Sequence, residues 1–170
     1  YVTYNIQTGK SYLINKVNYK NIGKQEIYDL IQSNKDKREI KQGDLFTYNT
    51  VNNERLEIEK MLKNNGYYKF SKELIYVNAD SVENNEINLD FLLKKLDVDS
   101  SAYKKFLVND IYINIDNPYN AALNDTTKNK DYYFITDNTK KLNIKLESIS
   151  KLVQIRSNKF YSQKEAENTY

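Results

Sequence analysis

The chain has 170 residues, of which 39% are hydrophobic and 29% are charged, so it can fill a modest core in one domain or in two small ones. Its net charge of +3 is too small to indicate a nucleic-acid interface, and no run approaches the roughly 20 apolar residues of a membrane span. Cys and His are both absent, which excludes disulfides, thiolate nucleophiles and the commonest zinc ligands. We therefore expect a chain that folds in water without a metal or a cofactor.

The first predicted element is a strand over residues 11–20. Its apolar side chains alternate from Tyr12 to Ile14 and again from Val17 to Tyr19, which is typical of a strand with one covered face. The alternation slips once, between Ile14 and Val17. This slip predicts a bulge or a local twist.

A short helix is expected next. Residues 24–32 place Ile27, Leu30 and Ile31 on one helical face, and a turn follows at residues 42–44.

The longest predicted helix runs from about residue 51 to residue 64. Its apolar stripe is formed by four side chains: Val51, Ile58, Met61 and Leu62. Four charged residues are expected on the solvent side: Glu54, Glu57, Glu59 and Lys63. Gly66 comes directly after two Asn residues, and all three tolerate the left-handed conformation with which many helices end.

Two strands close this unit. They are predicted over residues 67–79 and 86–96, joined by a turn at residues 80–85. In the second of them the apolar residues alternate: Ile87, Leu89, Phe91 and Leu93. The order is β-α-α-β-β, which indicates an α+β fold with two helices on one face of a three-stranded mixed sheet.

The chain repeats this pattern. The apolar pattern of the first strand recurs 94 positions later, in residues 106–113. The approach to the long helix, residues 43–46, recurs 115 positions later in residues 158–161, so the second unit carries 21 extra residues. We expect most of this insertion at residues 116–136.

The turn and the long helix carry the most specific motif. A Gly-Asp turn precedes a helix that contains Glu-Arg and ends in Gly-Tyr-Tyr, and the matching positions are Gly43, Asp44, Glu54, Arg55, Gly66, Tyr67, Tyr68 and Phe70. The pattern resembles a polypeptide-transport-associated (POTRA) domain, and more narrowly the periplasmic region of Bacteroidetes outer-membrane assembly proteins of the BamA/TamA class. The second unit resembles the family less well, because Asn158 replaces the Gly of the turn. Six later residues look like the start of the family's helix: Tyr161, Ser162, Gln163, Glu167, Thr169 and Tyr170.

The resemblance implies a tandem array. Residues 1–9 are similar to the closing strand of a preceding domain, residues 10–97 form a first POTRA-like domain, residues 98–102 a linker, and residues 103–170 a second domain. The second domain has its insertion near residues 116–136 and stops before a closing hairpin. We therefore expect a fragment in which the second sheet is incomplete and exposes an edge.

The family implies a non-enzymatic periplasmic scaffold for the assembly or translocation of outer-membrane β-barrels. Its partners would be unfolded outer-membrane clients, periplasmic assembly proteins and a carboxy-terminal barrel of its own that lies outside these residues. It would act by β-augmentation, in which a strand edge pairs with an extended client through main-chain groups. If the closing strand is central in the sheet, the second strand lies outside it, and the candidate binding residues are Leu74, Ile75, Tyr76 and Val77.

Two alternatives stay open. In a Tyr-rich surface for a glycan or another ligand, five tyrosines would converge on one concavity: Tyr68, Tyr76, Tyr112, Tyr132 and Tyr133. An enzyme would need a buried carboxylate pair in a cleft, which the spacing of the acidic residues does not reveal. Asp97, Asp99 and Ser100 resemble part of a calcium loop, but the required Gly and bidentate Glu are missing, so we interpret them as linker.

Overall fold

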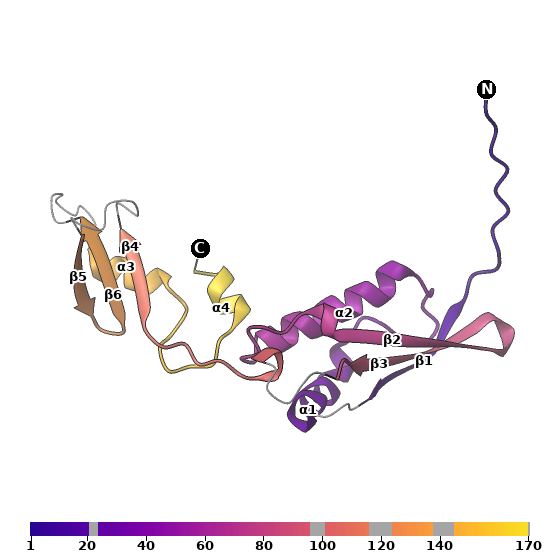
Figure 1. Ribbon diagram of the computed structural model, residues 1–170, viewed down its shortest axis with the longest axis horizontal. Helices are drawn as coiled ribbons and strands as arrows, with labels where there is room; N and C mark the ends of the chain where they lie inside the picture. Colours follow the sequence, from indigo (N-terminus) through magenta and orange to yellow (C-terminus); the bar gives the residue numbers. More distant parts are fainter. Residues whose placement is uncertain (21–23, 96–100, 116–123, 138–144, 170) are drawn as a thin grey trace. The chain divides into compact units, whose positions relative to one another are not determined.

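The structure is a computed structural model of the chain, and it describes residues 1–20, 24–95, 101–115, 124–137 and 145–169. The chain divides into two compact units (Figure 1). Unit 1 comprises Tyr1–Leu62 and Phe70–Tyr103, and unit 2 comprises Lys63–Lys69 and Lys104–Tyr170. Each unit is described by itself.

Unit 1 contains one sheet and two helices. The elements in chain order are β1 (Leu13–Lys20), α1 (Gln25–Ser33), α2 (Tyr48–Lys63), β2 (Ile75–Val82) and β3 (Glu86–Leu93). Four short 3-10 helices connect them: η1 (Lys35–Lys37), η2 (Lys72–Leu74), η3 (Glu83–Asn85) and η4 (Ser101–Tyr103). The sheet order is β1-β3-β2, with β3 parallel to β1 and antiparallel to β2. The predicted β-α-α-β-β order is therefore confirmed, and the closing strand β3 is central, which is the condition under which β2 lies at an edge.

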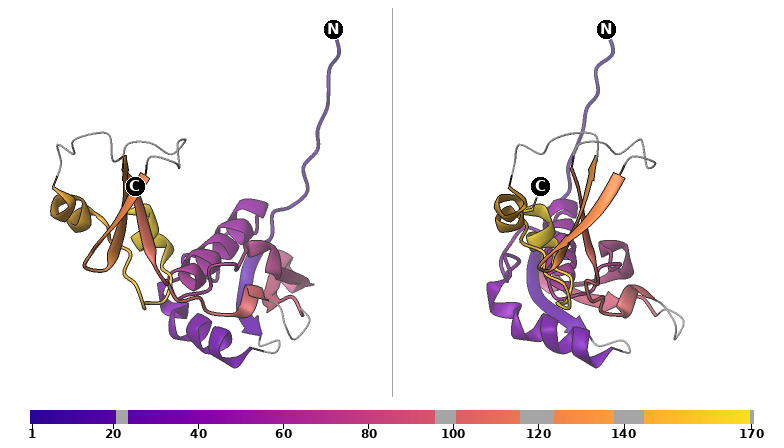
Figure 2. Two further views of the ribbon diagram at one scale, coloured as in Figure 1. Left: turned by 60° about the vertical axis from the view of Figure 1, so that its left-hand side comes forward. Right: turned by 90° about the vertical axis from the view of Figure 1, so that its left-hand side faces the viewer.

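Both helices cover one face of this sheet, as Figure 2 shows. The core joins alternate residues of β3 to one face of each helix: Ile87, Leu89, Phe91, Leu93, Ile27, Ile31, Ile58 and Leu62. The register of β1 against β3 shifts between Ile14 and Lys16, which confirms the predicted bulge. Residues 1–12 have no regular secondary structure.

The opposite face of the sheet is polar and hydrogen-bonded. Asn15 Nδ2 donates to Asn88 Oδ1 at 3.0 Å, and Asn18 Nδ2 donates to Asp90 Oδ1 at 2.7 Å. Lys20 Nζ lies 2.5 Å from Asp90 Oδ2. The hydrogen bond from Lys20, and after it the one from Asn18, hold the pKa of Asp90 below its usual value.

The prediction of a strand from residue 67 is wrong. Tyr67 and Phe70 are buried outside any strand, and Ser71 accepts a hydrogen bond from the Glu73 N–H at the start of η2. Strand β2 begins only at Ile75 and continues to Val82, through part of the predicted turn. Phe70 packs against the Tyr103 ring with ring centres 6.0 Å apart, while the polar end of β2 pairs with β3 through its backbone.

In the unit 2 sheet the third strand lies between the first and the second, as in unit 1, but the helices come after all three strands in the chain. Its elements are β4 (Ile111–Ile115), β5 (Asn124–Asn129), β6 (Tyr132–Asp137), α3 (Leu146–Leu152) and α4 (Gln163–Glu167). The sheet order is β4-β6-β5, with β6 parallel to β4 and antiparallel to β5. The sheet therefore has three strands, which differs from the incomplete sheet expected from the sequence. The segment interpreted as an insertion supplies the hairpin before the helices.

The core of unit 2 lies between its sheet and α3. Its buried residues are Tyr132, Phe134 and Val153, and partly buried apolar residues pack around them: Ile111, Ile113, Ile115, Leu146, Ile149 and Ile155. The segment after α2 also belongs to this unit. The Gly66 carbonyl accepts from the Phe106 N–H at 2.8 Å, and Asn64 Oδ1 accepts from the Lys164 N–H at 2.8 Å at the start of α4.

Each unit holds the start of its first strand by three backbone hydrogen bonds, which we call the strand-start pairing. In unit 1, Ile14 N–H donates to the Asp44 carbonyl at 2.8 Å, and the Gly43 N–H donates to the Ile14 carbonyl at 2.7 Å. The Phe46 N–H donates to the Tyr12 carbonyl at 2.9 Å.

The same three bonds recur in unit 2 at the predicted offsets. Val108 N–H donates to the Lys159 carbonyl and the Asn158 N–H to the Val108 carbonyl, each at 2.8 Å. The Tyr161 N–H donates to the Phe106 carbonyl at 2.9 Å. The repeat read from the sequence is thus present atom by atom in the backbone. The bulge predicted here as well is not seen, because residues 108–110 have no strand assignment.

The replacement of the turn Gly by Asn has a conformational explanation. Gly43 has a φ of +90° and Asn158 a φ of +59°, so both occupy the left-handed region. Asn adopts this region more readily than other residues with a side chain.

Candidate functional site

Strand β2 is one of the two edge strands of the unit 1 sheet, and the direction of its backbone N–H and C=O groups alternates from residue to residue. Leu74 lies opposite Lys94, and the Lys94 N–H donates to the Leu74 carbonyl at 2.7 Å. In an antiparallel pair such hydrogen-bonded positions alternate with positions whose N–H and C=O point away from the neighbouring strand. The outward positions are therefore Ile75, Val77, Ala79 and Ser81.

Side chains of α2 hold the residues that lead into β2. Arg55 donates to the Lys72 carbonyl from Nε at 3.2 Å and from Nη2 at 2.9 Å, and Nη2 also lies 3.2 Å from Glu73 Oε2. Glu59 Oε2 accepts from the Lys72 N–H at 2.8 Å, and Asn52 Oδ1 accepts from Lys72 Nζ at 2.9 Å. The Arg of the Glu-Arg motif thus fixes where the edge strand begins.

The four candidate residues from the sequence have different positions. Leu74 lies in η2 and its carbonyl is already bonded, while the Tyr76 backbone faces β3 and its side chain is exposed. Ile75 and Val77 have outward backbones, although the Ile75 side chain is buried. Residues 80–82 were assigned to the turn because their sequence gives no strand signal, yet they continue the same edge.

The opposite edge of the unit 1 sheet is partly covered. The strand-start pairing covers β1 from Tyr12 to Ile14, and Gln32 Nε2 donates to the Tyr19 carbonyl at 3.3 Å. The β2 edge is therefore the longer open one among the described residues.

In unit 2 the outermost strand is β5, and its hairpin to β6 has a two-residue loop between Asn129 and Tyr132. Because the residues that flank such a loop form a hydrogen-bonded pair, the Thr126 backbone faces away from β6. Its N–H already donates to Asp125 Oδ1 at 2.8 Å. An incoming strand would have to displace this carboxylate, so β5 is a poorer edge than β2.

Glu54, expected on the solvent side of α2, is buried, which corrects that prediction. Its Oε1 lies 2.5 Å from Arg38 Nη1, and the two side chains are only 1% and 6% exposed. The Tyr19 hydroxyl also donates to Oε1 at 2.8 Å, and the Arg38 guanidinium lies 5.1 Å from the centre of the Tyr19 ring. Burial raises the pKa of Glu54, and the positive charge of Arg38 opposes that shift.

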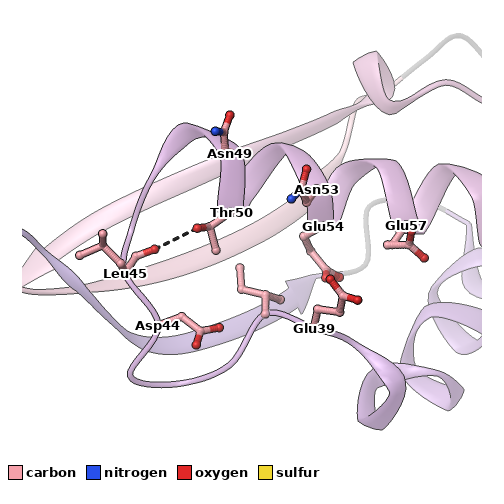
Figure 3. Close-up of a pocket in the computed structure, with 9 residues that line it drawn as sticks. Glu39, Asp44, Leu45, Asn49, Thr50, Asn53, Glu54 and Glu57 are labelled. Atoms are coloured by element: carbon pink, nitrogen blue, oxygen red, sulfur yellow. Dashed lines mark hydrogen bonds between the residues drawn. The ribbon is translucent and has the colours of Figure 1, made fainter.

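A pocket of about 340 Å³ opens beside the first half of α2 (Figure 3). Three carboxylates line it near the buried Glu54: Glu39, Asp44 and Glu57. Glu54 is already bonded to Arg38 and Tyr19, so it is not a free acid or base. Among the residues that the structure describes, no three or more His, Cys, Asp or Glu side chains are grouped to hold a metal ion. The calcium-like residues at 97–100 lie outside the described residues.

The five tyrosines that would mark a ligand surface do not all lie on open surface, because one of them is buried. Tyr76 is on the unit 1 sheet, whereas Tyr132 is buried in the core of unit 2. Tyr112 stacks on Tyr133 with ring centres 5.0 Å apart, and Tyr68 packs edge-on against two other rings of unit 2. The buried position of Tyr132 argues against an aromatic surface formed by all five rings.

The chain is thus a tandem of two small α+β modules with the same sheet order. No family model matches it, and no curated protein matches it in sequence. Its structure is similar to one described as the crystal structure of Haemophilus influenzae BamA POTRA3-5, with a TM-score of 0.48 and 10% identity. The similarity covers 93% of this chain and 48% of that one, so this chain spans about half its length. The fold described above stands on its own strand pairing and not on this likeness. No helix among the described residues is long and apolar enough to cross a membrane.

Proposed function

We propose that this chain is a non-enzymatic periplasmic scaffold of an outer-membrane β-barrel assembly or translocation protein. The proposal combines the POTRA-like motif of the sequence with one structural observation, the outermost position of β2 in the sheet. Its partners would be unfolded outer-membrane clients and periplasmic assembly proteins, and a carboxy-terminal barrel would attach it to the outer membrane.

The proposed mechanism is strand addition at β2. An extended client segment would pair with the outward N–H and C=O groups of Val77, Ala79 and Ser81. Main-chain pairing depends little on the client's sequence, which suits a protein that handles many different barrel precursors. The hydrogen bonds of Arg55 and Glu59 to Lys72 keep the start of the edge in place for this pairing.

Ala79→Pro is the variant that tests this edge most directly. Ala79 is exposed, and the Pro ring removes an N–H that points away from β3, so the sheet itself loses no hydrogen bond. Binding of an unfolded barrel-strand peptide, followed by NMR titration, should weaken about 2- to 10-fold, which is the net effect of one main-chain hydrogen bond. Ala79→Val keeps the donor and should bind like the parent.

Asn78→Pro provides a check on the register. The Asn78 N–H faces β3, so Pro at this position breaks a hydrogen bond of the sheet and should lower the stability of unit 1, unlike Ala79→Pro. A folded Ala79→Pro variant that binds as tightly as Ala79→Val would remove the β2 edge from the mechanism.

A further inference from the structure

A groove of about 420 Å³ lies beside β1, which is the edge strand at the other end of the sheet from β2. It lies between β1, α1 and η1 and is lined by side chains that include Val17, Tyr28, Gln32 and Ile40. Its volume falls within the roughly 300–1,000 Å³ of ligand-binding pockets. We call it the β1 groove.

The chain itself pairs with this edge and then turns away from it. The strand-start pairing places the Gly43–Phe46 segment antiparallel to the start of β1, with Leu13 opposite Leu45. In the chain, this segment is preceded by a turn in which the Lys41 N–H donates to Asp44 Oδ2 at 2.8 Å. Gly43, with its φ of +90°, lets the chain leave the edge there. The next part of the β1 edge is therefore not paired by this segment.

The backbone of β1 next to the groove points into it. The Tyr19 carbonyl accepts a hydrogen bond from Gln32 Nε2, so it faces away from β3, and the two-residue period of a strand gives Val17 the same direction. That hydrogen bond is 3.3 Å long, beyond the usual range for N–H···O bonds. A main-chain N–H of an incoming strand could replace it with better geometry.

The side chains of the groove add a preference that the β2 edge lacks. Among its lining residues, Ile40 is 8% exposed, and Tyr28 and Val17 are half-buried. Lys35 and Asp36 add charged groups to the lining. This combination suits an extended segment with an aliphatic side chain between polar ones, because alternate residues of a strand point to the same side.

We propose that the β1 groove is a second polypeptide-binding site, distinct from the β2 edge. It would take an extended partner segment as an antiparallel strand that continues the line of Gly43–Phe46, with one aliphatic side chain against Ile40 and Tyr28. The Gln32 side chain occupies the site until the segment binds and then releases the Tyr19 carbonyl.

The test is an NMR titration of the whole chain with a seven-residue peptide of alternating Thr and Val, blocked at both ends. The amides of Val17 and Tyr19 and the side-chain amide of Gln32 should shift together. A peptide with N-methyl groups on alternate residues should bind at this site at least about 10-fold more weakly, since several main-chain donors are lost. Replacing the central Val by Gly should also weaken binding.

The Gln32→Ala variant should bind the peptide more tightly, in contrast to the peptide changes above, which should weaken binding. It removes the side chain that the peptide must displace, so the affinity at Val17 and Tyr19 should rise about 2- to 10-fold. Shifts confined to Val77 and Ala79, equal binding of the N-methylated peptide, or unchanged or weaker binding to Gln32→Ala would each overturn the proposal. Binding at the β2 edge is measured separately, through the amide signals of Val77 and Ala79. Failure of the β1 groove proposal would therefore not decide the proposed function of the β2 edge.

Discussion

Removing one partner of the buried Arg38–Glu54 pair should destabilise unit 1 strongly. With side-chain exposures of 6% and 1%, neither charge can be solvated once its partner is gone. Glu54→Ala should therefore cost about 3–5 kcal/mol, the range for breaking a buried ion pair from one side. Since whole domains are stable by only about 5–15 kcal/mol, this single change removes a large share of the total.

The double variant Arg38→Met with Glu54→Leu tests whether the cost of the single change comes from leaving one charge without its partner. It removes both charges and keeps apolar volume, so it should be much closer to the parent than either single variant. The Tyr19 hydroxyl, which donates to Glu54, loses its partner in both cases, and Tyr19→Phe in the double variant should restore part of the remaining loss.

The assay is urea unfolding followed through the amide NMR signals of β3, which report unit 1 separately from unit 2. A cost below about 1 kcal/mol for Glu54→Ala would show that water reaches the carboxylate in solution, because exposed pairs contribute that little. A double variant whose loss equals the sum of the two single losses would also refute the reasoning, since it would show no coupling between Arg38 and Glu54.

Four further substitutions test other parts of the structure. Leu62→Ala, at a fully buried side chain, should cost about 2–5 kcal/mol in urea unfolding, whereas Glu57→Ala on the exposed face should stay within about 0.5 kcal/mol of the parent. Gly66→Ala should cost more than about 1 kcal/mol in thermal unfolding of unit 2, because φ is +97° and the new Cβ would lie 3.3 Å from atoms of two side chains. The pKa of Asp90 is lowered in the folded state, so its contribution is present above the unfolded pKa of about 3.9 and is lost as the pH falls through the folded value. Asp90→Asn should therefore melt below the parent at pH 7, and a gap that does not narrow in melts below about pH 4 would contradict this.

The sequence predicted the parts of the fold that depend on local pattern and spacing. The offsets of 94 and 115 residues found in the sequence reappear as Ile14 and Val108, and as Gly43 and Asn158, in equivalent hydrogen bonds. The expected position of β2 at a sheet edge depended on the order of elements together with the fold analogy, and the strand pairing agrees with it.

The burial of Glu54 depends on a partner that is distant in sequence. Arg38 lies 16 residues earlier, and nothing local links the two. A signal did exist, because Glu54 falls between Val51 and Ile58 at helical spacing, on the stripe otherwise occupied by apolar residues. A charge in that position predicts a buried partner of opposite sign.

The strand partners of β4 could not be found from the sequence. The hairpin of β5 and β6 precedes the helices of unit 2, whereas the corresponding hairpin of unit 1 follows them. Which hairpin joins which strand is decided by long-range pairing, and the polar sequence of β5 carries little apolar alternation. The same limit hid the outward-facing end of β2.

The strand-start pairing is made only of main-chain atoms, and this has a consequence for how such a chain can change over time. Ile14 and Val108 make the same bonds, as do Asp44 and Lys159, although the second pair even differs in charge. The residue type is restricted by the backbone angle at the position of Gly43 and by the need for an N–H, which excludes Pro, at the donor positions. Most other side-chain substitutions keep these main-chain atoms, so the two units can lose almost all sequence likeness while keeping the same strand-start pairing. Segments between the paired residues are equally free to lengthen, and the 21 additional residues of unit 2 lie where they alter no bond of the pairing.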